Sequence, residues 1–153
     1  MVLDVAPVAV AQLLIRRPPA EVFRAFVDPA ITSKFWFSSA SDSLAVGETV
    51  TWTWSWYGAT AEVIVDEIEP DRRILIRWPT PVEWLFTPKG PRATLVQVTA
   101  SKFEGSPNEQ VAQAIDAMGG FTLVLAGCKA YLEHEIELGL VPDQNPDHHV
   151  ALG

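Results

Sequence analysis

The sequence predicts a single α+β domain with a six-stranded antiparallel sheet, a long C-terminal helix and two short N-terminal helices. Three observations predict this class. The 12 prolines divide the chain into short segments, and many of these have the alternation of strands. Short turns connect the predicted strands, as in an antiparallel sheet. One long segment near the C-terminus has a complete helix start and helical spacing of its apolar residues.

The first elements are a strand and two short helices. Pro7 precedes an apolar strand, and Pro18-Pro19 suits the first turn of a helix. Asp28-Pro29 supplies an N-cap and a first helical residue for another helix. The sequence therefore predicts a strand over residues 8–15 and helices over residues 20–27 and 29–37.

The central part of the chain predicts five strands with tight connections. Gly58 connects the first two, and Pro70 takes the second position of a turn. Further prolines bound the later strands, because proline lacks the amide donor that a strand interior needs. The predicted strands cover residues 48–57, 60–68, 73–78, 82–86 and 93–103.

The last element is a helix over residues 108–138. Ser106, Pro107 and Glu109 form a helix start with a capping box, and Gly139 is a stop signal. One apolar stripe is expected to face the sheet: Val111, Ile115, Met118, Leu125, Leu132 and Ile136. A second stripe, roughly opposite, is expected to meet either the N-terminal helices, the tail or a second copy of the chain: Ala117, Gly120, Val124, Gly127 and Tyr131. Residues 1–141 are expected to form the domain, and residues 142–153 a loosely ordered tail.

A stripe of tryptophans lies on one predicted strand. Trp52, Trp54 and Trp56 alternate with Thr51, Thr53 and Ser55, so the three indoles share one face. We expect that face to point towards the long helix. The indoles either fill the core or line a cavity, because three of them would pack poorly against one helix unless something flat lay between.

Several segments carry a resemblance to a known family. They are "RRPPAEVFRAFVDPAITSKFWF", "VGETVTW", "VDEIEPDRRILIRW", "ATLVQVTASKFEG" and "GGFTLVLAGCKAYLE", within residues 15–133. Their order resembles the helix-grip fold of the START-like (SRPBCC) superfamily, and within it the homologues of the heat-shock-protein-90 ATPase activator. The chain departs from that family's pattern at Phe121, where a Trp is frequent, and at Ser101, where a His is frequent.

The resemblance implies a curved sheet gripping a helix, in many members with a cavity between them. We expect the chain to bind a small hydrophobic molecule there, aromatic or lipid-like, without catalysis. Two alternatives stay open: an enzyme of the polyketide cyclase or aromatase type, and a co-chaperone-like module that acts through its surface. The candidate ligand-binding residues are Phe35, Trp36, Trp52, Trp54, Trp56, Ile76, Trp78, Trp84, Val96, Val98, Met118, Thr122 and Leu125.

Other chemistry has weaker support. Alternation does not decide which face of the sheet Glu62 and Asp66 occupy, and solvated strand positions are the usual place for carboxylates. The three histidines have no recognised metal-ligand spacing. Cys128 lies at the border of an apolar helix face, as an inert thiol does. No catalytic residue, metal or cofactor is therefore expected.

Charge and composition limit the partners. The formal net charge of −8 argues against binding to nucleic acid, because phosphates need a basic patch. No apolar run reaches the length of a membrane span, since Lys129 interrupts the longest. The single cysteine fits a cytoplasmic protein. The expected partners are a small hydrophobic molecule, a second copy of the chain and a chaperone.

Overall fold

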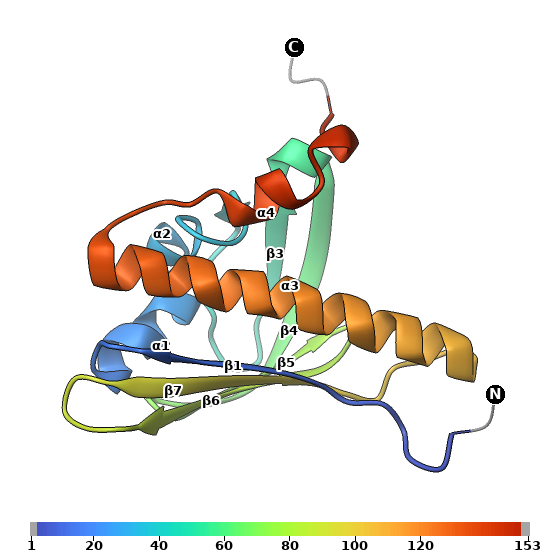
Figure 1. The fold of residues 1–153 in the computed structure, drawn as a ribbon, viewed down its shortest axis with the longest axis horizontal. Coiled ribbons are helices and arrows are strands. Elements are labelled where there is room, and N and C mark those ends of the chain that lie inside the picture. Colours follow the sequence, from blue (N-terminus) through green and yellow to red (C-terminus); the bar gives the residue numbers. More distant parts are fainter. Residues whose placement is uncertain (1–2, 151–153) are drawn as a thin grey trace.

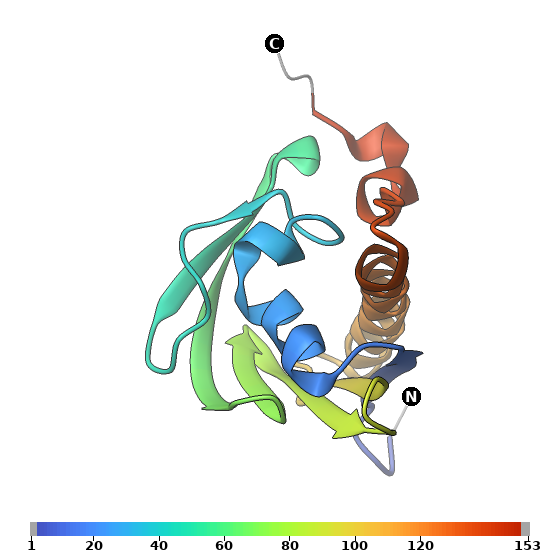
Figure 2. The same cartoon turned by 90° about the vertical axis from the view of Figure 1, so that its left-hand side faces the viewer.

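Seven antiparallel strands form one curved sheet in the computed structural model, which describes residues 3–150 (Figures 1 and 2). The strand order is β1-β7-β6-β5-β4-β3-β2, so the first strand pairs with the last. Every connection from β3 to β7 joins neighbouring strands. The strands are β1 (Ala9–Ile15), β2 (Ser39–Ala40), β3 (Thr49–Trp54), β4 (Ala59–Glu69), β5 (Arg73–Trp78), β6 (Thr80–Pro88) and β7 (Thr94–Ala100).

One strand more than expected is present. β2 has only two residues, Ser39 and Ala40, which pair with Thr53 and Trp52 of β3. A strand of two residues is too short to show any alternation in the sequence. The expected count of six strands is therefore wrong by this short edge strand, while the α+β class and the antiparallel pairing are confirmed.

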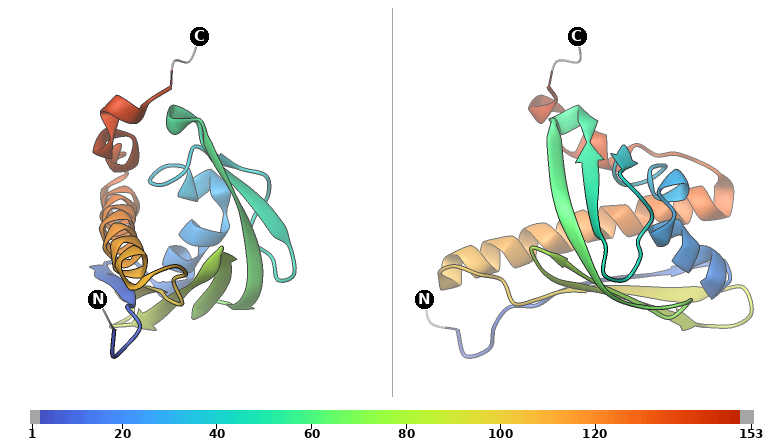
Figure 3. Two further views of the ribbon diagram at one scale, coloured as in Figure 1. Left: turned by 90° about the vertical axis from the view of Figure 1, so that its right-hand side faces the viewer. Right: turned by 180° about the vertical axis from the view of Figure 1, so that it is seen from behind.

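The helices occupy the concave side of the sheet. They are α1 (Pro19–Val27), α2 (Pro29–Thr32), α3 (Pro107–His134) and α4 (Leu140–Gln144), with single 3₁₀ turns at η1 (Ser55–Tyr57) and η2 (Pro146–His148). The long helix α3 runs across the open side of the curved sheet, with α1 and α2 between α3 and the sheet (Figures 2 and 3). This is the helix-grip arrangement that the resemblance implies.

The expected helix starts are confirmed, but two helix ends are wrong. Ser106 and Glu109 form the capping box, and Asp28 accepts from the amide of Ala30 at 3.0 Å. α2 ends at Thr32 rather than residue 37, because the residues that follow turn their aromatic side chains into the core. α3 ends at His134 rather than at residue 138. Glu135 ends the helix in the left-handed conformation. Glycine is the usual residue at such a position, so a glutamate there does not predict a helix end.

The buried face of α3 differs from the expected one. Ile115, Met118 and Ile136 are 63%, 47% and 51% exposed. The buried residues of α3 are Ala114, Phe121, Val124, Leu125, Gly127 and Cys128. α3 is apolar on nearly every side, so its hydrophobic pattern did not distinguish the two faces. The expectation that Ile115, Met118 and Ile136 belong to the inner stripe is therefore wrong, whereas Leu125 is buried and Leu132 packs against the core.

α3 is also long and apolar enough to cross a membrane, with a mean hydropathy of 1.4. The expectation that no segment reaches this length and composition is wrong for α3. In the fold, however, α3 closes the concave side of the sheet and packs along β1, with Phe121, Leu125 and Cys128 in the core. The core helix of a globular domain satisfies the same criterion.

The C-terminal segment returns across α3 towards the tip of the β3–β4 hairpin (Figure 1). α4 and η2 lie in this segment, and the hydroxyl of Tyr57 donates to the carbonyl oxygens of Val141 and Pro142. The amide of Val150 donates to the carbonyl of Trp56 at 2.8 Å. The domain boundary after residue 141 and the loose order of residues 142–153 stay predictions.

Candidate functional site

Two of the three tryptophans on β3 point into the core. Trp52 and Trp54 are 2% and 8% exposed, while Thr51 and Thr53 lie on the opposite face. Trp56 does not continue the stripe, because β3 ends at Trp54 and the chain turns into η1. Trp56 is only half-buried there. The expectation of a buried, inward-pointing indole is therefore confirmed for Trp52 and Trp54, whereas Trp56 lies outside the strand and packs against the core only partly buried.

The space between the β3 indoles and α3 is occupied by aromatic side chains of the protein itself. Trp36 and Phe37, in the segment after α2, insert into the concave side of the sheet. The ring centroids of Trp36 and Trp52 are 4.7 Å apart, and those of Phe37 and Trp52 are 5.3 Å apart. Most of the space beside Trp52 is therefore filled by protein. Of the two alternatives that the sequence left open, a filled core applies at Trp52.

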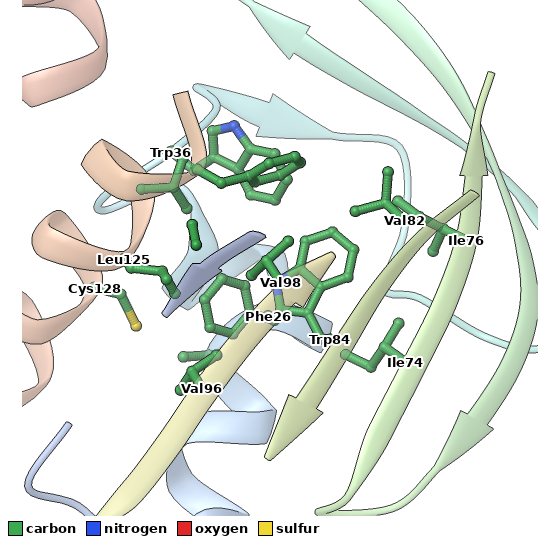
Figure 4. Packing of buried hydrophobic residues seen from close by; sticks show 14 of the residues in the cluster. Phe26, Trp36, Ile74, Ile76, Val82, Trp84, Val96, Val98, Leu125 and Cys128 are labelled. Carbon is green, nitrogen blue, oxygen red and sulfur yellow. The ribbon is translucent and has the colours of Figure 1, made fainter. Parts of the chain in front are cut away.

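The core continues from this aromatic cluster to the middle of α3. Figure 4 shows Leu125 and Cys128 of α3 on the side of Phe26, Val96 and Val98, with Trp36 above them and Trp84 on the sheet side. Trp84 is 2% exposed, and its indole nitrogen has no hydrogen-bond partner among the described residues. Its ring lies against those of Phe26 and Phe121, at 6.0 and 5.8 Å. Trp84 thus supplies apolar volume to the core.

A pocket of about 290 Å³ remains at one end of this cluster, between the N-terminal half of α3, the β5–β6 turn, the end of β7 and α4. Trp36, Trp78 and Phe121 supply aromatic surface, with Trp36 and Phe121 centroids 5.9 Å apart. Polar groups enter from Thr80, Gln113, Asp116 and Gln144. The complete lining is Trp36, Trp78, Pro79, Thr80, Val82, Ala100, Phe103, Gln113, Asp116, Ala117, Gly120, Phe121, Val124, Val141 and Gln144.

The expected ligand-binding residues divide into three groups. Trp36 and Trp78 line the pocket. Met118 and Thr122 are exposed on the outer side of α3, and Thr122 donates to the carbonyl of Met118 at 2.6 Å. The expected cavity around these two residues and Leu125 is therefore wrong, and the pocket lies on the neighbouring face of α3. Trp56 is half-buried. The remaining expected residues are buried in the core: Phe35, Trp52, Trp54, Ile76, Trp84, Val96, Val98 and Leu125.

The two glycines of the second helix stripe have different surroundings. A side chain at Gly127 would meet Phe35, whose Cβ lies 3.2 Å and whose backbone oxygen lies 3.3 Å from the position of an added Cβ. Gly127 is thus covered within the chain, as one of the sequence alternatives held. Gly120 lines the pocket, and an added Cβ there would meet nothing within 4 Å. The expectation of an interface between two copies at Gly120 and Gly127 is therefore wrong.

Phe121 is the main pocket residue that sequence reasoning missed. In the sequence, Phe121 is a departure from the family pattern, and it lies on the same helix face as Ala114, Ala117 and Val124. Its ring contacts those of Trp36, Trp78 and Trp84, with centroids 5.9, 6.3 and 5.8 Å apart. A test of each face of α3 for both aromatic and small residues would have favoured this face.

The carboxylates of the strands face solvent. Asp66 pairs with Arg77 at 2.9 Å, and Glu83 pairs with Arg73 at 2.6 Å. These ion pairs lie on the convex side of the sheet, because their residues alternate along β4 and β5 with the buried residues that face the concave side. Hydrogen bonds with Glu67 and then Glu83 raise the pKa of Arg73, and the hydrogen bonds with Asp66 raise that of Arg77. These carboxylates form ion pairs on the outer surface of the sheet and do not line the pocket.

Cys128 is fully buried in α3, and burial raises the pKa of its thiol. A thiol in such surroundings is a poor nucleophile, because the thiolate is the reactive form. Within residues 3–150, no three His, Cys, Asp or Glu side chains are grouped so that they could hold a metal ion.

Solved structures with the same fold have been found in several bacteria. A protein from Staphylococcus saprophyticus is 28% identical with a TM-score of 0.76, and the match covers 86% of this chain and 95% of that one. DynU16, a protein of the dynemicin biosynthetic locus, is 25% identical with a TM-score of 0.74. That match covers 86% of this chain but only 49% of DynU16. No curated protein matches the sequence.

A third structure, the Aha1 dimer from Colwellia psychrerythraea, is 15% identical with a TM-score of 0.71. That match covers 83% of this chain and 96% of the other, and it shows the shared fold alone. The family model described as "Activator of Hsp90 ATPase homolog 1-like protein" matches residues 16–133. These residues include most of the sheet, both N-terminal helices and nearly all of α3. The chain therefore belongs to the family of Activator of Hsp90 ATPase homolog 1-like proteins.

Proposed function

We propose that this protein binds a small, flat, largely apolar molecule in the pocket between α3 and the β5–β6 turn. The observation that carries the proposal is the pocket itself: about 290 Å³, bounded by Trp36, Trp78 and Phe121 and open to solvent at a polar edge. An apolar cavity of about 150 Å³ is large enough for benzene. The pocket therefore suits a body of about two fused rings, in keeping with the small end of known ligand sites.

Binding without catalysis fits the polar groups of the pocket better than a cyclase-type reaction. Asp116 is the one ionisable side chain among the described lining residues, and it is exposed at the rim. General acid–base chemistry needs a group within hydrogen-bond reach of the reacting atoms, usually with a perturbed pKa. The buried polar residues of the described chain, Thr32 and Thr94, are not part of the lining. We also place this binding function in the cytoplasm, on the strength of the single buried thiol.

The two glycines at the middle of α3 provide a matched test. Gly120 lines the pocket and Gly119 is exposed to solvent. An added Cβ at either glycine would meet no atom within 4 Å, so both positions have room for a side chain. Both Gly→Leu substitutions replace a helix-interior glycine and should preserve folding. The neutral probe 2-naphthalenemethanol should bind the wild-type protein with a Kd below about 1 mM.

Gly120→Leu should weaken this binding by roughly tenfold or more, since leucine fills the pocket, while Gly119→Leu should stay within about twofold of the wild type. The measurement is a titration followed by the indole N–H signals in NMR spectra. Signals of Trp36 and Trp78 should shift, and that of Trp56 should not. Undiminished binding by Gly120→Leu would exclude the pocket as the site.

As a second candidate, we propose self-association through the outer face of α3. Exposed Ile115 and Met118 lie on that face, together with the small residues Ala112 and Gly119. The structure from Colwellia psychrerythraea with the same fold is described as a dimer. The co-chaperone-like role expected from the resemblance has support from family membership alone.

A further inference from the structure

One edge of the pocket has a consistent chemical character. Gln113, Asp116 and Gly120 occupy one side of α3 at spacings of three and four residues, so they form a continuous rim. The side chain of Asp116 makes no ion pair and no hydrogen bond with any residue in 3–150. Its carboxylate is free to accept hydrogen bonds from a molecule in the pocket.

The neighbouring glutamine presents an acceptor as well. The side-chain amide nitrogen of Gln113 donates to the carbonyl oxygens of Glu104 and Glu109, at 2.8 and 3.1 Å. These bonds orient the amide group and leave its oxygen as the end without a partner among the described residues. Two acceptors, Asp116 and Gln113, therefore stand side by side at the rim, and their complement is a group with several N–H donors.

The apolar wall suits the same group. Trp36, Trp78 and Phe121 present aromatic rings to the pocket, and the face of an indole ring attracts a cation through its quadrupole. Trp78 is held in place by stacking on Trp54, with centroids 5.6 Å apart and an interplanar angle of 10°. A cation at this end of the pocket would have aromatic surface on one side and a carboxylate on the other.

The remaining charges disfavour an anion. None of the described lining residues is Lys or Arg, so a carboxylate or phosphate on the ligand would have no cationic partner. The formal net charge of the protein is −8, which repels anions at longer range. A fatty acid or an aromatic acid is therefore a poor fit for this pocket.

From these observations we infer that the pocket selects aromatic cations, with an aryl body against the Trp36, Trp78 and Phe121 rings and an ammonium group at Asp116. The inference rests on the proposed binding function and adds the class of ligand. Asp116 is the specificity-determining residue. Cation–π attraction and the ion pair together should favour the cation roughly 5- to 30-fold over a neutral molecule of the same shape.

Three naphthalene probes of one shape test the inference: 2-naphthylmethylamine as the cation, 2-naphthalenemethanol as the neutral probe and 2-naphthoate as the anion. Each is titrated calorimetrically at low and high salt. The cation should bind tightest and the anion weakest, and the difference should shrink as salt screens the ion pair. Asp116→Asn should remove the ion pair and lower the preference for the cation to the roughly two- to fivefold that cation–π attraction alone supplies.

Asp143→Asn is the matched control. It removes one negative charge from α4 close to the pocket, but Asp143 is not part of the lining. It should leave the preference unchanged. Equal binding of all three probes, or tightest binding of the anion, would overturn the inference and leave the proposed function standing. A cation preference that Asp116→Asn leaves undiminished would overturn the role of Asp116. Failure of all three probes would instead contradict the proposed function.

Discussion

Trp36 belongs both to the core and to the pocket wall. One part of its ring packs on Trp52, and its centroid lies 5.8 Å from that of Trp78 and 5.9 Å from that of Phe121. Aromatic pairs at these separations stabilise a fold beyond the area that they bury. The rings that shape the pocket are therefore held by rings that belong to the core, which keeps the pocket open in the absence of a ligand.

Replacing Trp52 or Trp56 by alanine should lower the free energy of unfolding by different amounts. Trp52→Ala should lower the free energy of unfolding by about 3–5 kcal/mol, because its side chain is buried among Trp36, Phe37 and Trp54. Trp56→Ala should cost less than about 2 kcal/mol, since Trp56 is half-buried in η1. Urea denaturation of both variants measures the difference. Equal losses of stability would contradict the smaller burial of Trp56.

At the scale of elements, the C-terminal end of α3 is tied to the end of β1 by a polar cluster. Glu133 accepts from the amide of Arg16 at 2.9 Å and from Nζ of Lys129 at 2.6 Å. Lys129 also donates to the carbonyl of Leu14 at 2.7 Å. These contacts set where α3 crosses the edge of the sheet.

Burial raises the pKa of Glu133, but the hydrogen bonds from Arg16 and Lys129 and the charge of Lys129 outweigh it. The pKa therefore lies below its ordinary value of 4.5. A lowered pKa in the folded state means that the charged carboxylate stabilises the fold above pH 4.5. That contribution is lost as the pH falls below 4.5 through the folded-state value.

Glu133→Gln should accordingly reduce stability near neutral pH by roughly 1.5–3 kcal/mol, the range for hydrogen bonds to charged groups. The gap between variant and wild type should close as the pH falls below 4.5. Thermal unfolding across a pH series measures this gap. Glu137→Gln, at an exposed position beyond α3, is the control and should show no gap. A gap for Glu133→Gln that stays constant with pH would contradict the assignment.

At the scale of the whole molecule, α3 has two apolar sides and the fold covers one of them. The covered side packs on β1 and on the segment that contains Phe35. The other side leaves Ile115 and Met118 at 63% and 47% exposure. Exposed apolar surface on a central helix is the kind of surface that closed two-fold dimers bury.

We expect the wild-type protein to form a dimer at micromolar concentration. Replacement of Ile115 and Met118 by glutamine together should shift it to a 16.8 kDa monomer, because the apolar contact is lost without any change in charge. Sedimentation equilibrium measures both states. Ile136→Gln is the control, since Ile136 is similarly exposed but lies beyond the end of α3. A wild-type monomer up to about 100 µM would contradict self-association, and a dimer that survives the double replacement would have its interface elsewhere.

The sequence by itself determined the elements and their order, because local physics encodes them. Proline positions bounded most of the strands, although Pro81 and Pro88 lie within β6 and the strand expected over residues 82–86 is longer. The Ser106 capping box began α3, and alternation placed Trp52 and Trp54 on the inner face. The match to residues 16–133 confirms the family resemblance, which supplied the arrangement of sheet and helix that the structure shows. Glu135 and the edge strand β2 escaped this reasoning, since neither has a signal in neighbouring residues.

Only the tertiary structure decided which side of α3 is buried and where the pocket lies. α3 is apolar around most of its circumference, so hydrophobic spacing alone permits several faces. The buried face is selected by fit: Gly127 admits the backbone of Phe35, and Phe121 meets Trp36 and Trp84. The pocket is the space that these long-range contacts leave unfilled beside Gly120 and Trp78. Such a space depends on the packing of segments far apart in the chain, and close packing is a property of the folded molecule as a whole.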